Sequence, residues 1–153
     1  MDFKLTSPVF QEGAYIPKKH TGEGPDASPQ LKWTDPPAGT KSLALICDDP
    51  DAPVGTWVHW VIWGIKPDAR ELPEGVPTKE AAANGTKQGI NDFKKIGYGG
   101  PMPPRGSDHR YFFKLYALDT EINLAPGATK KALLDAMKGH VLAETQIMGR
   151  YKR

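Results

Sequence analysis

Cysteine is nearly absent from this chain of 153 residues, because Cys47 is the only one. A single thiol cannot form an internal disulfide, which is compatible with a reducing compartment. The N-terminus has no apolar run after a basic patch, and no stretch approaches the roughly 20 apolar residues of a membrane span. We therefore expect a cytoplasmic protein with no membrane span, folded as one domain over residues 1–153.

An excess of charge of one sign is also missing. The chain carries 20 basic and 18 acidic residues, a net charge of +2, and its lysines occur as scattered pairs such as Lys18-Lys19 and Lys94-Lys95. A nucleic-acid-binding surface normally shows a concentrated basic patch. We therefore expect no nucleic-acid partner.

Long helical patterns are scarce, whereas turn residues are plentiful: 15 prolines and 16 glycines. They divide the chain into short extended segments. Strands are predicted over 3–10, 28–33, 42–47, 56–65, 110–118 and 141–151. One helix is predicted over 128–138, capped by Thr129 and stopped by Gly139, with a single helical turn over 80–83. This pattern predicts a mainly β protein, an antiparallel β-sandwich with a few peripheral helices, one near the C-terminus.

The segment 56–65 contains three tryptophans and one histidine, His59. Strict alternation of side chains would place His59 on one face with Trp57, Val61 and Trp63. Both faces are apolar, so we expect this strand inside the sandwich or under a helix. His20, in contrast, lies among lysines and glycines and is expected to be exposed.

The segment 97–113 changes from a glycine- and proline-rich loop to an aromatic strand. His109, Tyr111 and Phe113 share one face of that strand, so a stiff loop delivers an imidazole and a phenol to the same side of a sheet. The loop amides are expected to face a ligand. A Pro/Gly-rich turn beside a hydrogen-bonded histidine is the alternative interpretation.

Three carboxylates, Asp48, Asp49 and Asp51, follow the strand 42–47. They cannot all be buried as ions without partners. Aspartates that only cap a turn are the alternative interpretation.

Taken in order, Asp49-Pro50-Asp51-Ala52-Pro53, Trp57-Val58-His59-Trp60, Gly100–Gly106 and His109-Arg110-Tyr111 resemble the phosphatidylethanolamine-binding protein family, which includes the Raf kinase inhibitor protein. Supporting matches, such as Gly89-Ile90-Asn91-Asp92-Phe93, cover most of the chain, and its length resembles the compact bacterial and archaeal branch. The resemblance implies two antiparallel sheets with a small anion-accepting pocket at one edge. It also implies a cis peptide bond before Pro53.

Carried over position by position, the resemblance assigns ligand binding to Asp49, Asp51, Pro53, Trp57, His59, Met102, Pro103, His109 and Tyr111. It implies no catalytic residue, no metal and no cofactor. The residue types suit phosphate or a phosphate-bearing headgroup: two imidazoles become cationic at little cost, and an adjacent carboxylate fixes the tautomer of one and raises its pKa. Tyr111 offers a hydroxyl donor. Anion binding is therefore expected to be tighter at pH 6 than at pH 8.

Two features depart from the family pattern. The long C-terminal helix of larger eukaryotic members is missing, so phospholipid and kinase binding carry over poorly. Gly22 stands where many compact members have a cysteine. Compact relatives often dimerise, so the resemblance is compatible with a homodimer.

Three other functions compete with anion binding. The first is a metal site built from Asp49, Asp51, His59 and His109, and the second is hydrolysis with Ser107 or Cys47 as nucleophile. The third is inhibition of a kinase or serine protease through the pocket edge and adjacent loops. The sequence favours a regulatory or inhibitory binding module over an enzyme.

Overall fold

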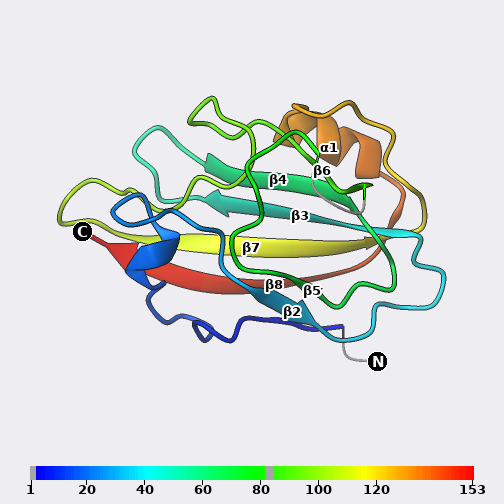
Figure 1. Cartoon of the computed structure of the whole chain (residues 1–153), viewed down its shortest axis with the longest axis horizontal. Helices are drawn as coiled ribbons and strands as arrows, with labels where there is room; N and C mark the ends of the chain where they lie inside the picture. The colour runs from blue at the N-terminus through cyan, green and yellow to red at the C-terminus, as the bar shows by residue number, and fades with distance from the viewer. Residues whose placement is uncertain (1–2, 82–84) are drawn as a thin grey trace.

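The computed structural model describes residues 3–81 and 85–153, which form two antiparallel sheets (Figure 1). The smaller sheet has the strand order β1-β2-β5, with β1 at Leu5–Thr6, β2 at Leu31–Trp33 and β5 at Glu71–Leu72. The larger sheet has the order β6-β4-β3-β7-β8. Its strands are β6 (Lys87–Gln88), β4 (Trp57–Ile65), β3 (Ser42–Asp49), β7 (Asp108–Leu118) and β8 (Val141–Lys152). The predicted mainly β sandwich is confirmed.

The main core lies between the two sheets. Leu31 and Trp33 of the smaller sheet belong to the same buried cluster as Leu45, Trp60 and Phe113 of the larger one. Each of these side chains is almost completely removed from water. Their burial is the dominant favourable contribution to this part of the fold.

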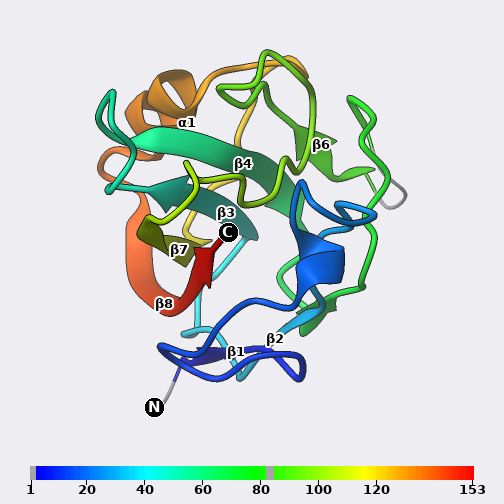
Figure 2. The ribbon, with the colours of Figure 1, turned by 90° about the vertical axis from the view of Figure 1, so that its left-hand side faces the viewer.

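The other face of the larger sheet is covered by helix α1 (Lys130–Met137), which lies on the opposite side from β1 and β2 (Figure 2). Leu133 and Met137, one helical turn apart, pack there against Ile46, Val61 and Trp63. Two covered faces explain why every residue of β3 is buried.

The helix has the ends that the sequence predicts. The Thr129 side chain accepts a hydrogen bond from the Ala132 amide, and Gly139 adopts a φ of 83° just after the helix. The predicted helical turn over 80–83 is wrong at Ala81, which forms an isolated bridge with Lys87 instead; residues 82–84 lie outside the described residues. Within the described residues, no helix is long and apolar enough to cross a membrane.

Strand β4 contains an irregularity at His59. Cys47 pairs with Trp60, and the next residue, Asp48, pairs with Val58, so His59 is one extra residue on β4. A bulge of this kind changes which face the following side chains occupy. Val61 and Trp63 pack under the helix while His59 lies with Trp57 on the other side, so the prediction that these four share one face is wrong.

The segment before β2 is more ordered than the sequence suggests. A short 3-10 helix, η1, spans Lys18–His20, and His20 is completely buried, whereas we expected it to be exposed. Its Nδ1 atom lies 2.8 Å from the carbonyl oxygen of Ala27. Its own carbonyl accepts a hydrogen bond from the Tyr98 hydroxyl, 2.6 Å away. His20 therefore supports the loop that precedes β7.

Candidate functional site

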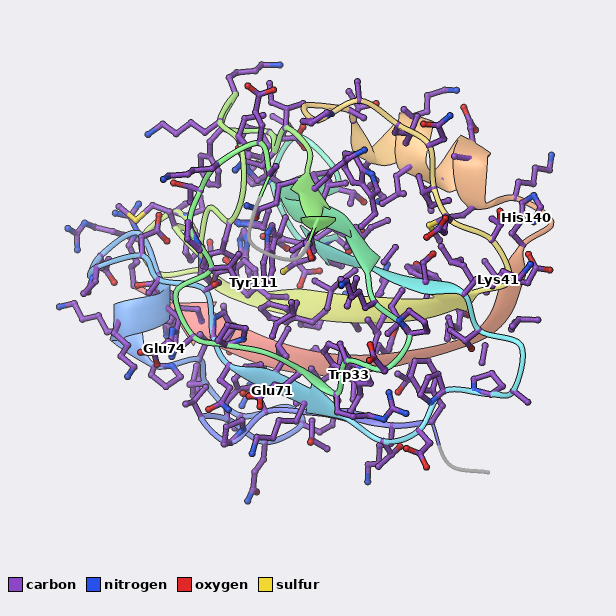
Figure 3. All side chains as sticks on the ribbon, turned by 45° about the vertical axis from the view of Figure 1, so that its right-hand side comes forward. Trp33, Lys41, Glu71, Glu74, Tyr111 and His140 are labelled. Atoms are coloured by element: carbon purple, nitrogen blue, oxygen red, sulfur yellow. The ribbon has the colours of Figure 1, made fainter. Side chains whose placement is uncertain are left out.

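A cavity of about 250 Å³ lies where β3 ends and where β4 and β7 begin. Eight of the nine residues predicted to bind a ligand line it: Asp49, Pro53, Trp57, His59, Met102, Pro103, His109 and Tyr111. Tyr111 lies near one end of β7, far from Lys41 and His140 at the opposite end of the sheet (Figure 3). Segments distant in sequence therefore converge at one edge of the sandwich.

Asp51, the ninth predicted residue, lies outside the cavity. Its two carboxylate oxygens accept hydrogen bonds from Nε and Nη2 of Arg110 at 2.9 and 2.8 Å, and one of them also accepts the Arg110 amide. These bonds hold the pKa of Asp51 below its ordinary value. Asp51 thus fastens the turn after β3 to β7.

No peptide bond among the described residues is cis, so the cis bond implied before Pro53 is absent.

Asp49 orients the imidazole of His109. Its Oδ2 atom lies 2.7 Å from Nδ1 of His109, and both side chains are almost fully buried. Because a carboxylate only accepts, the proton of this bond belongs to Nδ1. The other oxygen of Asp49 accepts the Asp51 amide at 2.7 Å. Both carboxylate oxygens are therefore engaged by the protein.

His59 has a different environment. Its Nδ1 atom lies 2.5 Å from the carbonyl oxygen of Gly99, and its ring meets the edges of Tyr111 and Phe93 at centroid distances of 5.1 and 5.4 Å. Burial lowers the pKa of His59, and the opposing effects of the Gly99 carbonyl and Asp49 are smaller. The expectation that both imidazoles become cationic at little cost is therefore wrong for His59.

Tyr111 supplies a permanent hydroxyl donor. Burial, followed by the nearby charge of Asp49, raises the pKa of its phenol far above the ordinary value, so the O–H stays protonated. Trp57, on the cavity wall, has a buried indole Nε1 with no hydrogen-bond partner in the described part of the chain.

The rim of the cavity is held by hydrogen bonds from two sides. The Pro101 carbonyl accepts the Gly22 amide at 2.9 Å, and the Pro103 carbonyl accepts Nε of Arg153 at 2.5 Å. The Gly99 and Gly100 amides donate to the His59 carbonyl and to Oδ1 of Asp26. These two amides are used within the protein, so the expectation that they face a ligand is wrong.

The three clustered carboxylates are all paired, each with a different group. Asp48 points to the helix side of the sheet, where its oxygens lie 3.3 Å from Nζ of Lys114 and 2.7 Å from Nζ of Lys130. Asp49 faces the cavity and Asp51 binds Arg110. Alternation along β3 separates Asp48 from Asp49, which resolves the problem of burying adjacent negative charges.

Four further residues line the cavity that the sequence interpretation did not assign to ligand binding: Ala52, Val54, Phe93 and Pro104. The most informative is Phe93, whose ring packs edge-on against Trp57 at 5.5 Å and against His59. Phe93 is the last residue of the Gly89–Phe93 match to the family. The sequence therefore indicated that this position matters but did not indicate that its side chain lines the cavity. The neighbouring Asp92 accepts the Val58 amide at 2.7 Å and holds this segment against β4.

The geometry gives little support to hydrolysis or to a metal centre. Cys47 is fully buried in the sandwich core, and burial raises the pKa of its thiol well above the ordinary value. Nδ1 of His109 is occupied by Asp49, and no bond joins Ser107 Oγ to that ring. Over residues 3–81 and 85–153, no group of three or more His, Cys, Asp or Glu side chains is arranged to hold a metal ion.

Fold and site together define a class: a β-sandwich with a small, largely apolar cavity at one end of its larger sheet, into which a few polar side chains converge. A sequence model of the family described as phosphatidylethanolamine-binding protein matches residues 6–152, and the chain belongs to this family. The family resemblance is thereby confirmed.

Relatives from archaea and bacteria match almost the whole chain. The UPF0098 protein of Methanothermobacter thermautotrophicus is 50% identical over 97% of this chain and 98% of its own length. That of Aquifex aeolicus is 53% identical over 98% of this chain and 88% of its own length. Among solved structures, Escherichia coli YbcL, described as a member of the mammalian PEBP family, superposes with a TM-score of 0.93 at 32% identity, covering 100% of this chain and 99% of YbcL.

Proposed function

We propose that this protein binds a small phosphate-bearing molecule or headgroup in the cavity and acts as a regulatory or inhibitory binding module. The observation that carries the proposal is the convergence of His59, His109 and the Tyr111 hydroxyl on one cavity, with Asp49 holding His109 in a fixed tautomer. Polar groups that converge in a largely apolar pocket are typical of a ligand site.

The size of the cavity supports a small ligand. Its volume of about 250 Å³ lies just below the range of about 300–1,000 Å³ that is usual for sites of drug-sized molecules. A phosphate or phosphate monoester fits this scale, with its remaining atoms outside the mouth.

The hydrogen-bond donors in the cavity support an oxyanion as the ligand. The Tyr111 hydroxyl donates at all ordinary pH values because its pKa is raised. Since Nδ1 of His109 donates to Asp49, a second proton on Nε2 would give a further donor, and the Asp49 carboxylate supplies the counter-charge. Donors of this kind recognise phosphate oxygens.

A titration with inorganic phosphate, followed by histidine NMR shifts and tryptophan fluorescence, tests this function. Saturable binding is expected, tighter at pH 6 than at pH 8, and it should be lost in His109→Ala and strongly weakened in His59→Ala. His140→Ala is the matched control, because His140 also pairs with a carboxylate, Asp119, but lies at the opposite end of the sheet (Figure 3). Absence of phosphate binding to the intact protein would overturn the proposal.

One observation favours a second candidate, inhibition of a kinase or serine protease. Three large apolar side chains at the cavity are exposed: Val54 to 78%, Met102 to 42% and Phe93 to 37%. Exposed apolar groups gathered around a pocket are typical of protein-binding surfaces. Inhibition assays on both enzyme classes, with Val54→Asp as the rim variant, would test it. Inhibition by the intact protein should be weakened by Val54→Asp; if it is unchanged, the cavity rim is not the inhibitory surface.

A further inference from the structure

We infer that His59 makes the cavity selective for an oxyanion that carries its own proton, because the histidine presents a lone pair, not an N–H group, to the ligand. This inference rests on the proposed anion-binding function and names the ligand form. It selects hydrogen phosphate or a phosphate monoester monoanion, each of which has a P–OH group. It disfavours sulfate, and phosphate diesters without another donor group, because neither has a hydroxyl that could donate to His59.

The tautomer of His59 follows from one contact. The Gly99 carbonyl oxygen, 2.5 Å from Nδ1, can only accept, so Nδ1 carries the proton. In a neutral ring the second nitrogen, Nε2, is then an acceptor. No group in the described part of the chain hydrogen-bonds to Nε2, and His59 lines the cavity. A bound ligand must therefore donate to this atom or leave it unpaired.

The surroundings of His59 keep the ring neutral. Phe93 and Tyr111 pack around it as uncharged aromatic groups. Asp49 is the carboxylate facing the same cavity, but its oxygens accept from His109 and from the Asp51 amide. Asp26, from the segment before β2, accepts the Gly100 amide. Burial accordingly outweighs these carboxylates and lowers the pKa of His59.

The two cavity histidines are thus chemically distinct. Nδ1 of His109 meets a carboxylate, which can balance an imidazolium charge, whereas Nδ1 of His59 meets a neutral carbonyl. One side of the cavity therefore suits the charged oxygens of the ligand, and the other suits its hydroxyl. An acceptor left facing an oxyanion loses a hydrogen bond and gains electrostatic repulsion, a combination by which proteins reject ligands that lack a donor.

Calorimetric titration of the full chain tests this selectivity, with inorganic phosphate, methyl phosphate, dimethyl phosphate and sulfate at pH 6.5 and constant ionic strength. Phosphate monoesters have a second pKa near 6, so a substantial fraction carries a P–OH at this pH. We expect the first two ligands to bind at least about tenfold more tightly than the last two. ¹⁵N NMR of His59 should show Nε2 unprotonated in the free protein.

Two substitutions separate the roles of the ring nitrogens. His59→Asn keeps an amide donor near Nδ1 for Gly99 but removes the group at Nε2, so phosphate affinity should fall. His59→Gln places a rotatable amide near Nε2, which can donate or accept, so the preference for phosphate over sulfate should fall towards one. A chemical-shift spectrum of each variant would establish that it is folded.

The outcomes distinguish this inference from the function on which it rests. Equal binding of phosphate and sulfate to the unsubstituted protein would overturn the selectivity and leave the anion site standing. So would a phosphate preference unchanged in a folded His59→Gln variant. Binding of none of the four ligands would overturn the proposed function and the selectivity with it.

Discussion

At the scale of single residues, the role of each histidine depends on what its Nδ1 atom meets. His109 and His140 meet carboxylates, one buried and one exposed, whereas His20 and His59 meet backbone carbonyls and are buried. A carbonyl partner fixes the tautomer without supplying a counter-charge. The four histidines therefore differ in whether a neighbouring carboxylate can balance the charge of a protonated ring.

The lowered pKa of His59 predicts a pH dependence of stability. As the pH falls below about 6.5, the unfolded chain takes up a proton at position 59, while the folded protein resists it until a lower pH. Because the unfolded state then binds more protons, the free energy of unfolding decreases as the pH falls through this window.

Urea unfolding at pH 7.5, 6.5 and 5.5 measures this effect. The intact protein should lose more stability between pH 7.5 and 5.5 than His59→Gln, whose side chain does not titrate. All other ionisable groups are common to both proteins. Identical pH profiles would show that burial of His59 does not disfavour its protonation.

At the scale of elements, the rim loop before β7 is defined by close backbone contacts. A Cβ atom at Gly100 would lie 2.3 Å from the His20 carbonyl oxygen and 2.5 Å from Oδ1 of Asp26. At Gly22 the nearest atoms belong only to the flexible Met102 side chain, the closest at 2.9 Å. The two glycines therefore differ in how easily their neighbours can move.

Gly100→Ala is expected to destabilise the protein by about 1–3 kcal/mol or more, because backbone must move to admit the methyl group. Gly22→Ala is the matched control and should cost much less, since Met102 can change rotamer. Chemical denaturation of the two variants gives both values. Equal costs would mean that the loop around Gly100 adapts as readily as a side chain.

Strand β4 shows how one extra residue sets up a site. The bulge lets Val61 and Trp63 pack beneath α1 while His59 reaches the cavity on the other face. Without it, the alternation in β4 would place His59 on the helix side. Bulges are often found beside functional sites for this reason.

At the scale of the whole molecule, the cavity is lined by residues from segments that are far apart in the sequence. Asp49 ends β3, Phe93 lies in the connection after β6, and Met102 belongs to the loop before β7. A ligand that contacts all three binds only the folded state. Its binding free energy therefore adds to the stability of the entire domain.

Phosphate is accordingly expected to raise the melting temperature of the protein. At a concentration 100 times the dissociation constant, stabilisation should reach about 2.7 kcal/mol, which for a domain of this size corresponds to a shift of several degrees. Thermal scans of the intact protein and His109→Ala measure it, with the substituted protein showing no shift. An equal rise in both would indicate a general salt effect.

The sequence alone determined much of this fold, because the relevant signals are local. The apolar runs of β3 and β4, the Thr129 cap and the apolar positions of α1 depend on neighbouring residues and predicted their elements to within a few residues. The ordered motifs predicted nine ligand-binding residues, and eight of them line one cavity. The family pattern behind that prediction is confirmed by the comparison.

Only the tertiary structure decided how those residues are used. The sheet face on which His59 lies depends on a shift in the pairing of β4 with β3. The burial of His20 depends on the loop that contains Tyr98, and the position of Asp51 outside the cavity depends on Arg110, 59 residues away. Likewise, the rim glycine amides find partners in His59 and Asp26. Each outcome is set by a contact between distant segments, and spacing along a chain carries no information about which distant group satisfies a donor or an acceptor.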